Sequence, residues 1–191
     1  MRTLILDTST NLLYISFIEN DNIIYEVKSF GLNNHSDHLL PLIEEGLNKN
    51  NLKVKDFDRI ILGGGPGAYT GLRVSMSVAK MFAWTLNIPL YSISSLDLLT
   101  TGYKENGLYL VKFKAKKGYI YHKAFSICDN NKKIEKEEMF ISEDYIETYT
   151  EENKTIISND DISIDSLNIK ENELTLVSNV HALEPNYMRE S

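Results

Sequence analysis

The chain lacks the residues that would suggest a disulfide, a membrane span or a cysteine-based metal site. Its 191 residues include one cysteine, Cys128, which has no partner within the chain and is expected to be a buried small apolar residue. No stretch approaches the roughly 20 apolar residues that cross a bilayer. Asp7 interrupts the first apolar run before a signal-peptide core could form. We therefore expect a cytoplasmic protein with no membrane contact.

Basic residues are also scarce. Lysine and arginine number 20 against 27 acidic residues, so the net charge of -7 opposes broad affinity for nucleic acid. One basic cluster is interleaved with aromatic residues and consists of Lys112, Lys114, Lys116, Lys117 and Lys123. Lys112, Lys114 and Lys116 alternate with apolar residues, as on a strand with one solvated face. The cluster is therefore either such a face or an RNA contact.

The first half of the chain predicts alternating strands and helices. Apolar periodicity and turn residues indicate strands at 3–7, 12–18, 23–28, 58–62 and 88–93, and helices at 36–48, 70–86 and from 94 or 95 onward. Ser36 or Asp37 is the expected N-cap of the first helix. The helix at 70–86 is apolar or small around most of its circumference, which predicts protein on more than one face. This order is typical of an α/β fold with a mixed sheet.

A change in composition near 102–107 predicts a domain boundary. We expect an N-terminal lobe at 1–102, which carries the partner-binding helices, and a smaller C-terminal lobe at 103–191. Within the second lobe the sequence predicts strands at 108–115, 119–127, 154–157 and 174–177, with a short helix from Ser142 to Thr148. The segment 132–138 is rich in lysine and glutamate, and no element is predicted there.

A glycine-rich corner follows the strand at 58–62 and leads into the helix at 70–86. It lacks the lysine of a P-loop, and no acidic residue closes the next strand as a dinucleotide site would require. Two interpretations remain open. The corner either offers backbone amides to an anion or presents the following helix to another protein. Candidate anion-facing residues are Asp7, Ser9, Gly65, Gly67 and Thr70.

The sequence offers no recognisable catalytic constellation and no convincing metal site. His35 and His38 are spaced for one helix face, but two neighbouring ligands rarely hold zinc alone. No serine or cysteine lies in a nucleophile motif. We expect a helix-start or interface role for the two histidines. We predict no catalytic residue and no bound metal.

Several motifs resemble those of the bacterial TsaB (YeaZ) family in order and spacing. The most specific is GPGAYTGLR at 65–73, and the supporting motifs are LILDTS at 4–9, HSDHLLP at 35–41, IPL at 88–90, SSL at 94–96, AKKGYIY at 115–121 and EPNYMR at 184–189. The segment at 115–121 departs from the family's Asp-Ala-Arg pattern, with Lys114 and Lys116 at the charged positions. Any role of that segment in the family therefore does not transfer directly.

The resemblance implies an actin-like (Hsp70 and sugar kinase) fold of two lobes, each with a mixed β-sheet and flanking helices. It also implies a non-catalytic subunit that pairs with the catalytic TsaD protein. With the ATPase TsaE, this pair would support threonylcarbamoyl transfer to an adenosine of certain tRNAs. The chain would need no cofactor, since ATP is used by the partner subunits. It would form a homodimer when alone and meet tRNA through the complex.

In the resembling family, the helices that match 36–48 and 70–86 pack against the equivalent pair of the partner. This implies interface roles for His35, His38, Leu42, Arg73, Ser75, Met76, Ala79, Lys80 and Ala83. Small residues such as Ala79 would allow close approach of helices. The alternative is a nucleotide-binding actin-like enzyme or a metallopeptidase-like protein, for which Asp7 and the corner amides would form the site.

Overall fold

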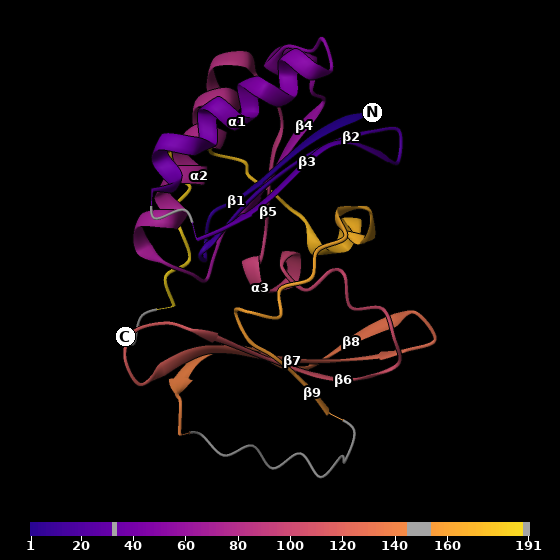
Figure 1. Cartoon of the computed structure of the whole chain (residues 1–191), viewed down its shortest axis with the longest axis vertical. Helices are drawn as coiled ribbons and strands as arrows, with labels where there is room; N and C mark the ends of the chain where they lie inside the picture. The colour runs from indigo at the N-terminus through magenta and orange to yellow at the C-terminus, as the bar shows by residue number, and fades with distance from the viewer. Residues whose placement is uncertain (32–33, 145–153, 189–191) are drawn as a thin grey trace. The chain divides into compact units, whose positions relative to one another are not determined.

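The computed structural model describes residues 1–31, 34–144 and 154–188 (Figure 1). The chain divides into two compact units. The first contains Met1–Leu98 and Ser166–Tyr187, and the second contains Leu99–Asp165 together with Met188. The segment 166–187 therefore returns to the first unit after the main part of the second. The division into domains at 102/103 stays a prediction.

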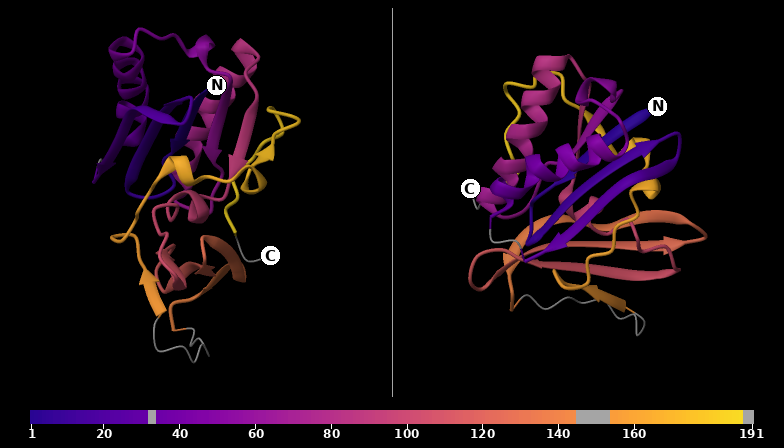
Figure 2. Two further views of the ribbon diagram at one scale, coloured as in Figure 1. Left: turned by 90° about the vertical axis from the view of Figure 1, so that its right-hand side faces the viewer. Right: turned by 45° about the horizontal axis from the view of Figure 1, so that its top comes forward.

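A six-stranded mixed sheet forms the frame of the first unit, in the order β10-β5-β4-β1-β2-β3 (Figure 2). The strands β1, β4 and β5 are parallel, and antiparallel pairing adds β2 and β3 on one side and β10 on the other. Their bounds are β1 Arg2–Asp7, β2 Leu12–Glu19, β3 Asn22–Phe30, β4 Arg59–Gly63, β5 Leu90–Ile93 and β10 Thr175–Leu176. β10 was expected in the second lobe, but it pairs with β5 at the edge of the first sheet.

Two long helices, α1 (His35–Lys49) and α2 (Tyr69–Leu86), pack on the same face of this sheet (Figure 1). One buried cluster unites Leu4 of β1 and Ile60 of β4 with Ile43 of α1 and Met76 of α2. Because every second strand residue points to this face, the apolar alternation of β1 and β4 meets the apolar stripes of both helices. A short helix, α3 (Ser95–Leu98), follows β5 and is capped by Ser94 Oγ, as predicted.

The helix ends differ slightly from the predicted bounds. α1 begins at His35 with Asn34 as its N-cap, so the expected caps Ser36 and Asp37 lie inside the helix. The carbonyl of Asn34 accepts from the amide of Asp37 at 3.1 Å, which closes the first turn one residue earlier. α2 begins at Tyr69, one residue before the predicted start, and ends at Leu86 as predicted; the left-handed φ of 55° at its C-cap suits Asn87.

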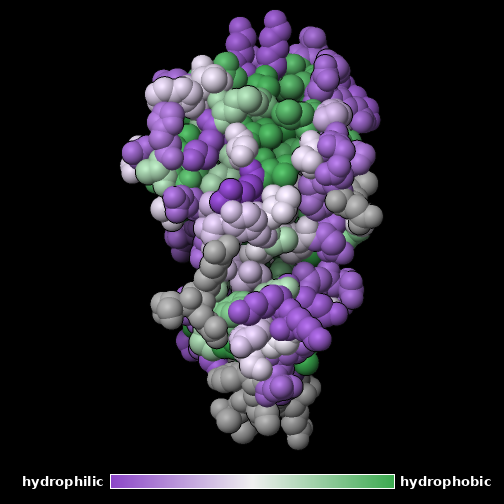
Figure 3. All heavy atoms as spheres, turned by 90° about the vertical axis from the view of Figure 1, so that its left-hand side faces the viewer, coloured by the Kyte–Doolittle hydropathy of each residue, from purple (hydrophilic) through white to green (hydrophobic). Residues whose placement is uncertain are grey.

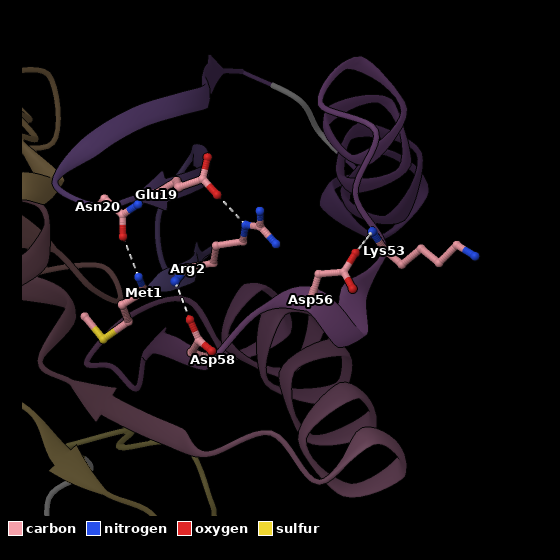
Figure 4. A network of polar contacts seen from close by, with 7 residues as sticks. All are labelled: Met1, Arg2, Glu19, Asn20, Lys53, Asp56 and Asp58. Carbon is pink, nitrogen blue, oxygen red and sulfur yellow. Dashed lines mark hydrogen bonds and ion pairs between the residues drawn. The ribbon is translucent and has the colours of Figure 1, made fainter.

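Polar contacts fasten the start of β1 to its neighbours (Figure 4). The Arg2 amide donates to Asp58 Oδ2 at 2.6 Å, and Arg2 Nε donates to Glu19 Oε1 at 2.6 Å. The Met1 ammonium donates to Asn20 Oδ1 at 2.6 Å. These bonds fix the edge at which β1, β2 and the segment before β4 meet.

A four-stranded mixed sheet forms the second unit, in the order β8-β7-β6-β9. Its strands are β6 Gly107–Lys114, β7 Tyr119–Cys128, β8 Asn131–Ser142 and β9 Lys154–Ile157, and β9 has the predicted bounds. Cys128 is the last residue of β7 and is exposed, so the expectation of a buried cysteine was wrong. It precedes the tight turn at Asp129–Asn130 and therefore lies outside the core.

The strand β8 was not predicted because its many charged residues obscure the apolar alternation that is typical of a strand. It is an edge strand and carries lysines and glutamates along its exposed positions, as edge strands commonly do. Asp129 and Asn130, with φ of 50° and 63°, form the positive-φ turn that joins it to β7. The helix predicted from Ser142 to Thr148 falls mostly outside the described residues. Within the described part, the flanking helices belong to the first unit.

An α/β class with two mixed sheets is thus confirmed. Three short 3₁₀ turns, Val54–Asp56, Ser166–Asn168 and Glu171–Glu173, complete the described elements. No helix in the described part of the chain is both long and apolar enough to span a membrane.

Candidate functional site

The glycine corner at Gly63–Gly67 requires small residues because protein atoms approach its backbone closely. A Cβ on Gly63 would lie 1.7 Å from Asp7 Oδ2, and one on Gly67 would lie 2.4 Å from the carbonyl oxygen of Ser9. Gly65 has a φ of +108°, and a Cβ there would lie 2.4 Å from the carbonyl oxygen of Asn186. The Gly65–Pro66 peptide bond is cis. These glycines are therefore needed for packing between segments of the first unit.

The backbone amides of the corner already have partners within the chain. The Gly64 amide donates to the Ile93 carbonyl at 2.8 Å, and the Gly65 amide donates to Ser95 Oγ at 3.0 Å. The Ala68 amide donates to the Ser9 carbonyl at 2.7 Å. An anion would have to displace these bonds before it could be held by the same amides. The anion-facing role of Gly65, Gly67 and Thr70 stays a prediction, and of these three only Thr70 is exposed.

Asp7, the acidic residue nearest the corner, is fully buried and accepts three hydrogen bonds. Its Oδ1 accepts from the amide and the hydroxyl of Ser9, both at 2.7 Å, and its Oδ2 accepts from Ser95 Oγ at 2.7 Å. Burial raises the pKa of Asp7, and the bonds from Ser9 and Ser95 act in the opposite direction. The carboxyl group therefore joins the end of β1 to α3, with no face open to a substrate.

The residue after Asp7 attaches the same turn to α2. Thr8 Oγ1 donates to the Gly71 carbonyl at 2.6 Å and accepts from the Ser75 amide at 3.2 Å. A Cβ on Gly71 would lie 2.0 Å from the carbonyl oxygen of Thr8, so only glycine permits this contact. The turn that could have faced a phosphate thus packs against the first turns of the helix.

Four predicted interface residues of α2 are buried within the first unit. Ser75 and Ala79 are fully buried, and Met76 and Ala83 are nearly so. Met76, Ala79 and Ala83 belong to the buried cluster that α2 forms with its own sheet. The small side chains of Ser75, Ala79 and Ala83 permit close packing of the helix, so direct contact of these residues with a partner would require rearrangement. Their role in partner binding stays a prediction.

Arg73 and Lys80, also predicted at the interface, hold the segment 177–187, which we name the C-terminal strap. Lys80 Nζ donates to the carbonyls of His181 and Leu183 at 3.0 and 2.9 Å. Arg73 Nε donates to the Tyr187 hydroxyl at 2.9 Å. The strap runs alongside α2 in both views of the ribbon (Figures 1 and 2). These two cations therefore have partners inside the unit.

Aromatic contacts strengthen both ends of the strap. The rings of Tyr69 and Tyr187 stack with centroids 4.9 Å apart, and the Arg73 guanidinium lies 4.2 Å from the Tyr69 centroid. At the other end, Trp84 packs edge-on against His181 at 4.0 Å. The Asn186 amide also donates to the Gly64 carbonyl at 2.8 Å. The strap thus packs against the corner and along one side of α2, where it contacts Tyr69, Arg73, Lys80 and Trp84.

The two long helices leave large apolar side chains in solvent. Trp84 is 63% exposed and Met81 45% on α2, and Leu40 is 44% exposed on α1. Figure 3 shows apolar side chains gathered on the face of the first unit that carries these helices. We name Leu40, Met81 and Trp84 the outer helix face. The prediction missed it, although Met81 and Trp84 are three residues apart and therefore share one face of the helix.

The predicted interface residues of α1 differ in exposure. His38 is exposed, and Leu42 packs partly against the core. His35 is half-buried, with its Nε2 2.9 Å from the Thr10 carbonyl, and its buried Nδ1 has no hydrogen-bond partner among the described residues. The described residues contain no group of three or more histidine, cysteine or acidic side chains that could hold a metal ion.

The predicted lysine cluster divides in two. Lys114, Lys116 and Lys117 are exposed around the β6–β7 turn, and Lys112 is half-buried. Lys123 is buried, and its Nζ lies 3.5 Å from Glu138 Oε1. The strand alternation of 112 and 114 with buried Val111 and Phe113 is confirmed.

Comparisons with known proteins agree with these features. Residues 29–178 match the family model described as TsaD, tRNA N6-adenosine threonylcarbamoyltransferase. The tRNA threonylcarbamoyladenosine biosynthesis protein TsaB of Bacillus subtilis is 35% identical over 122 residues, which cover 63% of this chain and 53% of that protein. TsaB of Escherichia coli is 25% identical over 133 residues, which cover 68% of this chain and 57% of that protein. The chain thus spans about half the length of these relatives.

Two solved structures show the same fold. YeaZ from Pseudomonas aeruginosa superposes with a TM-score of 0.69 at 22% identity, over 78% of this chain and 71% of that one. A second Pseudomonas aeruginosa structure, of a protein described as similar to peptidase YEAZ, gives a TM-score of 0.71 at 21% identity, over 82% and 74% of the two chains. Together with the family model, these matches show that the chain belongs to the TsaD-related family of tRNA threonylcarbamoyladenosine biosynthesis proteins, as a TsaB (YeaZ) member.

Proposed function

We propose that this chain is a non-catalytic subunit that binds TsaD and supports threonylcarbamoyl transfer to tRNA. The observation that carries the proposal is the outer helix face. Large apolar side chains on neighbouring helices are costly to leave in water, and grouped exposure of this kind marks protein interfaces. Trp84, with 63% of its surface exposed, is the residue type most often found at the energetic centre of an interface.

The contacts at the glycine corner support a scaffold role over catalysis. A carboxylate that acts on a substrate or holds a metal needs a lone pair directed at it. Asp7 is fully buried and is engaged through both oxygens by Ser9 and Ser95. The enzyme alternative would need this residue to be opened. In our proposal ATP is used by the partner subunits, and TsaE joins only when TsaD is present.

The same helices would form the homodimer when the chain is alone. A dimer and a TsaD heterodimer that use one surface exclude each other, because each buries the outer helix face. Adding TsaD should therefore convert dimer to heterodimer. Analytical ultracentrifugation of the chain with increasing TsaD would detect this exchange. A complex that holds one TsaD and the intact dimer of this chain would contradict it.

The test replaces Trp84 by glutamate and measures co-purification with TsaD. A buried charge together with the loss of an aromatic anchor should weaken binding by about 2 kcal/mol or more, roughly 30-fold. The matched control is Leu176→Glu, since Leu176 is 56% exposed on β10, away from both helices. Binding by Trp84→Glu equal to wild type would refute the proposal. Ala79→Glu would not be informative, because Ala79 is fully buried and the substitution would damage the core of the unit.

A further inference from the structure

The turn between β6 and β7 presents three lysines in four residues. Lys114, Lys116 and Lys117 are all exposed. The turn is held by two backbone bonds, from the Ala115 amide to the Tyr119 carbonyl at 3.0 Å and from the Tyr119 amide to the Lys116 carbonyl at 2.9 Å. We name residues 114–117 the lysine tip. Its charges therefore stand on an ordered hairpin.

No acidic side chain neutralises these lysines within residues 1–31, 34–144 and 154–188. Other lysines of the same unit do form ion pairs there. Lys133 lies 3.0 Å from Glu135, Lys104 pairs with Asp165, and Lys123 lies 3.5 Å from Glu138. In a chain of net charge -7, three uncompensated ammonium groups at one turn make a local site for anions.

Two aromatic rings hold the central lysine of the tip. Lys116 Nζ lies 4.6 Å from the centroid of Tyr119 and 5.2 Å from that of Phe140. These rings stack on each other, with centroids 4.9 Å apart and planes 2° apart. The rings are therefore engaged with each other and with the lysine. This arrangement suits contact with a phosphate backbone better than stacking of a base.

We propose that the lysine tip contacts the phosphate backbone of the RNA substrate. The inference rests on the proposed function, which makes that substrate a tRNA. The contact carries no sequence preference, because ammonium groups on phosphates read charge and position alone.

The test measures binding of unmodified bulk tRNA to the full chain over a range of salt concentrations. The triple variant Lys114→Gln, Lys116→Gln and Lys117→Gln should bind about tenfold more weakly at low salt. Each phosphate contact contributes about 0.9 to the slope of log affinity against log salt, so the slope should fall by about 2 to 3. The matched control is Lys53→Gln, Lys55→Gln and Lys170→Gln, which removes three exposed lysines of the first unit.

Four results would overturn the proposal. Wild type could fail to bind tRNA at low salt, the control could lose as much affinity as the tip variant, or the slope could stay unchanged in the tip variant. Binding to phosphatidylglycerol vesicles in place of tRNA would also overturn it and assign the tip to a lipid surface. Co-purification with TsaD is a separate readout. If the chain does not co-purify with TsaD but the tip variant still binds tRNA more weakly, the scaffold proposal fails and the RNA contact stands. If the chain co-purifies with TsaD but the tip variant binds tRNA as wild type does, only the RNA contact fails.

Discussion

The glycine corner and the lysine tip are both candidate anion sites, and they differ in whether their donors are already used. At the corner, the amides of Gly64, Gly65 and Ala68 bond to protein oxygens, and Asp7 is buried beside them. At the tip, three ammonium groups are exposed, and no ion pair engages them in the described chain. A glycine-rich turn before a helix is therefore not in itself an anion site. Such a turn can bind an anion only if its hydrogen-bond donors are not already used by protein oxygens.

The largest expected difference between the two sites is in the free energy of unfolding when one glycine at each is replaced by alanine. Gly63→Ala would place a Cβ 1.7 Å from Asp7 Oδ2, and we expect a loss of more than about 3 kcal/mol in the free energy of unfolding. Gly118→Ala beside the tip meets nothing within 4 Å and costs only the positive φ of 78°, about 1 to 2 kcal/mol. Urea denaturation of both variants tests this. Equal losses would remove the contrast between a packed corner and an open tip.

Comparison of wild type with Asp7→Asn tests the glycine corner through the pH dependence of the free energy of unfolding. Burial raises the pKa of Asp7 in the folded state above its ordinary value of 3.8. Folding therefore favours the protonated acid, and this contribution is complete below the unfolded pKa and is lost as pH rises through the folded pKa. Relative to the variant, wild type should lose stability as pH rises from about 4. Parallel stability curves for the two proteins would show that Asp7 titrates normally and that the corner is open to water.

A smaller effect is expected where the strap meets α2. Lys80→Ala removes two hydrogen bonds to strap carbonyls and should cost about 1 kcal/mol. It should also speed proteolysis within 178–187. The control is Lys49→Ala, which removes a solvent-exposed ion pair with Glu45 and should change the free energy of unfolding less than Lys80→Ala does. Unchanged cleavage of the strap in Lys80→Ala would mean that its apolar residues alone hold it.

Local patterns in the sequence were enough to predict most elements of the first sheet. The alternation in β1 and β4 and the helical stripe of α1 are short-range features that one face of a sheet imposes. The charged edge strand β8 was not predicted, because its lysine- and glutamate-rich composition was read as a segment without regular structure. The place of β10 beside β5 could not be read from the sequence, since that pairing joins residues about 80 positions apart in the chain.

The candidate site was predicted less completely than the fold. The apolar composition of α2 indicated that protein packs on more than one side of the helix, but it did not show which side faces the sheet. Ala79 and Ala83 were expected at the interface from the family resemblance; both are buried in the first unit, and Met81 and Trp84 are exposed. The family resemblance placed Arg73 and Lys80 at an interface, and their contacts with the strap, about 100 residues later in the sequence, were not predicted. Long-range pairings of this kind leave no local signal.

The return of residues 166–187 to the first unit has a consequence for synthesis on the ribosome. The main part of the second unit, Leu99–Asp165, is contiguous in the chain and can fold as soon as it emerges. The first unit must wait with its β5 edge unpaired and the side of α2 that carries Lys80 uncovered until β10 and the strap arrive. Nascent chains stopped before residue 175 should therefore depend on chaperones more than those stopped after 187.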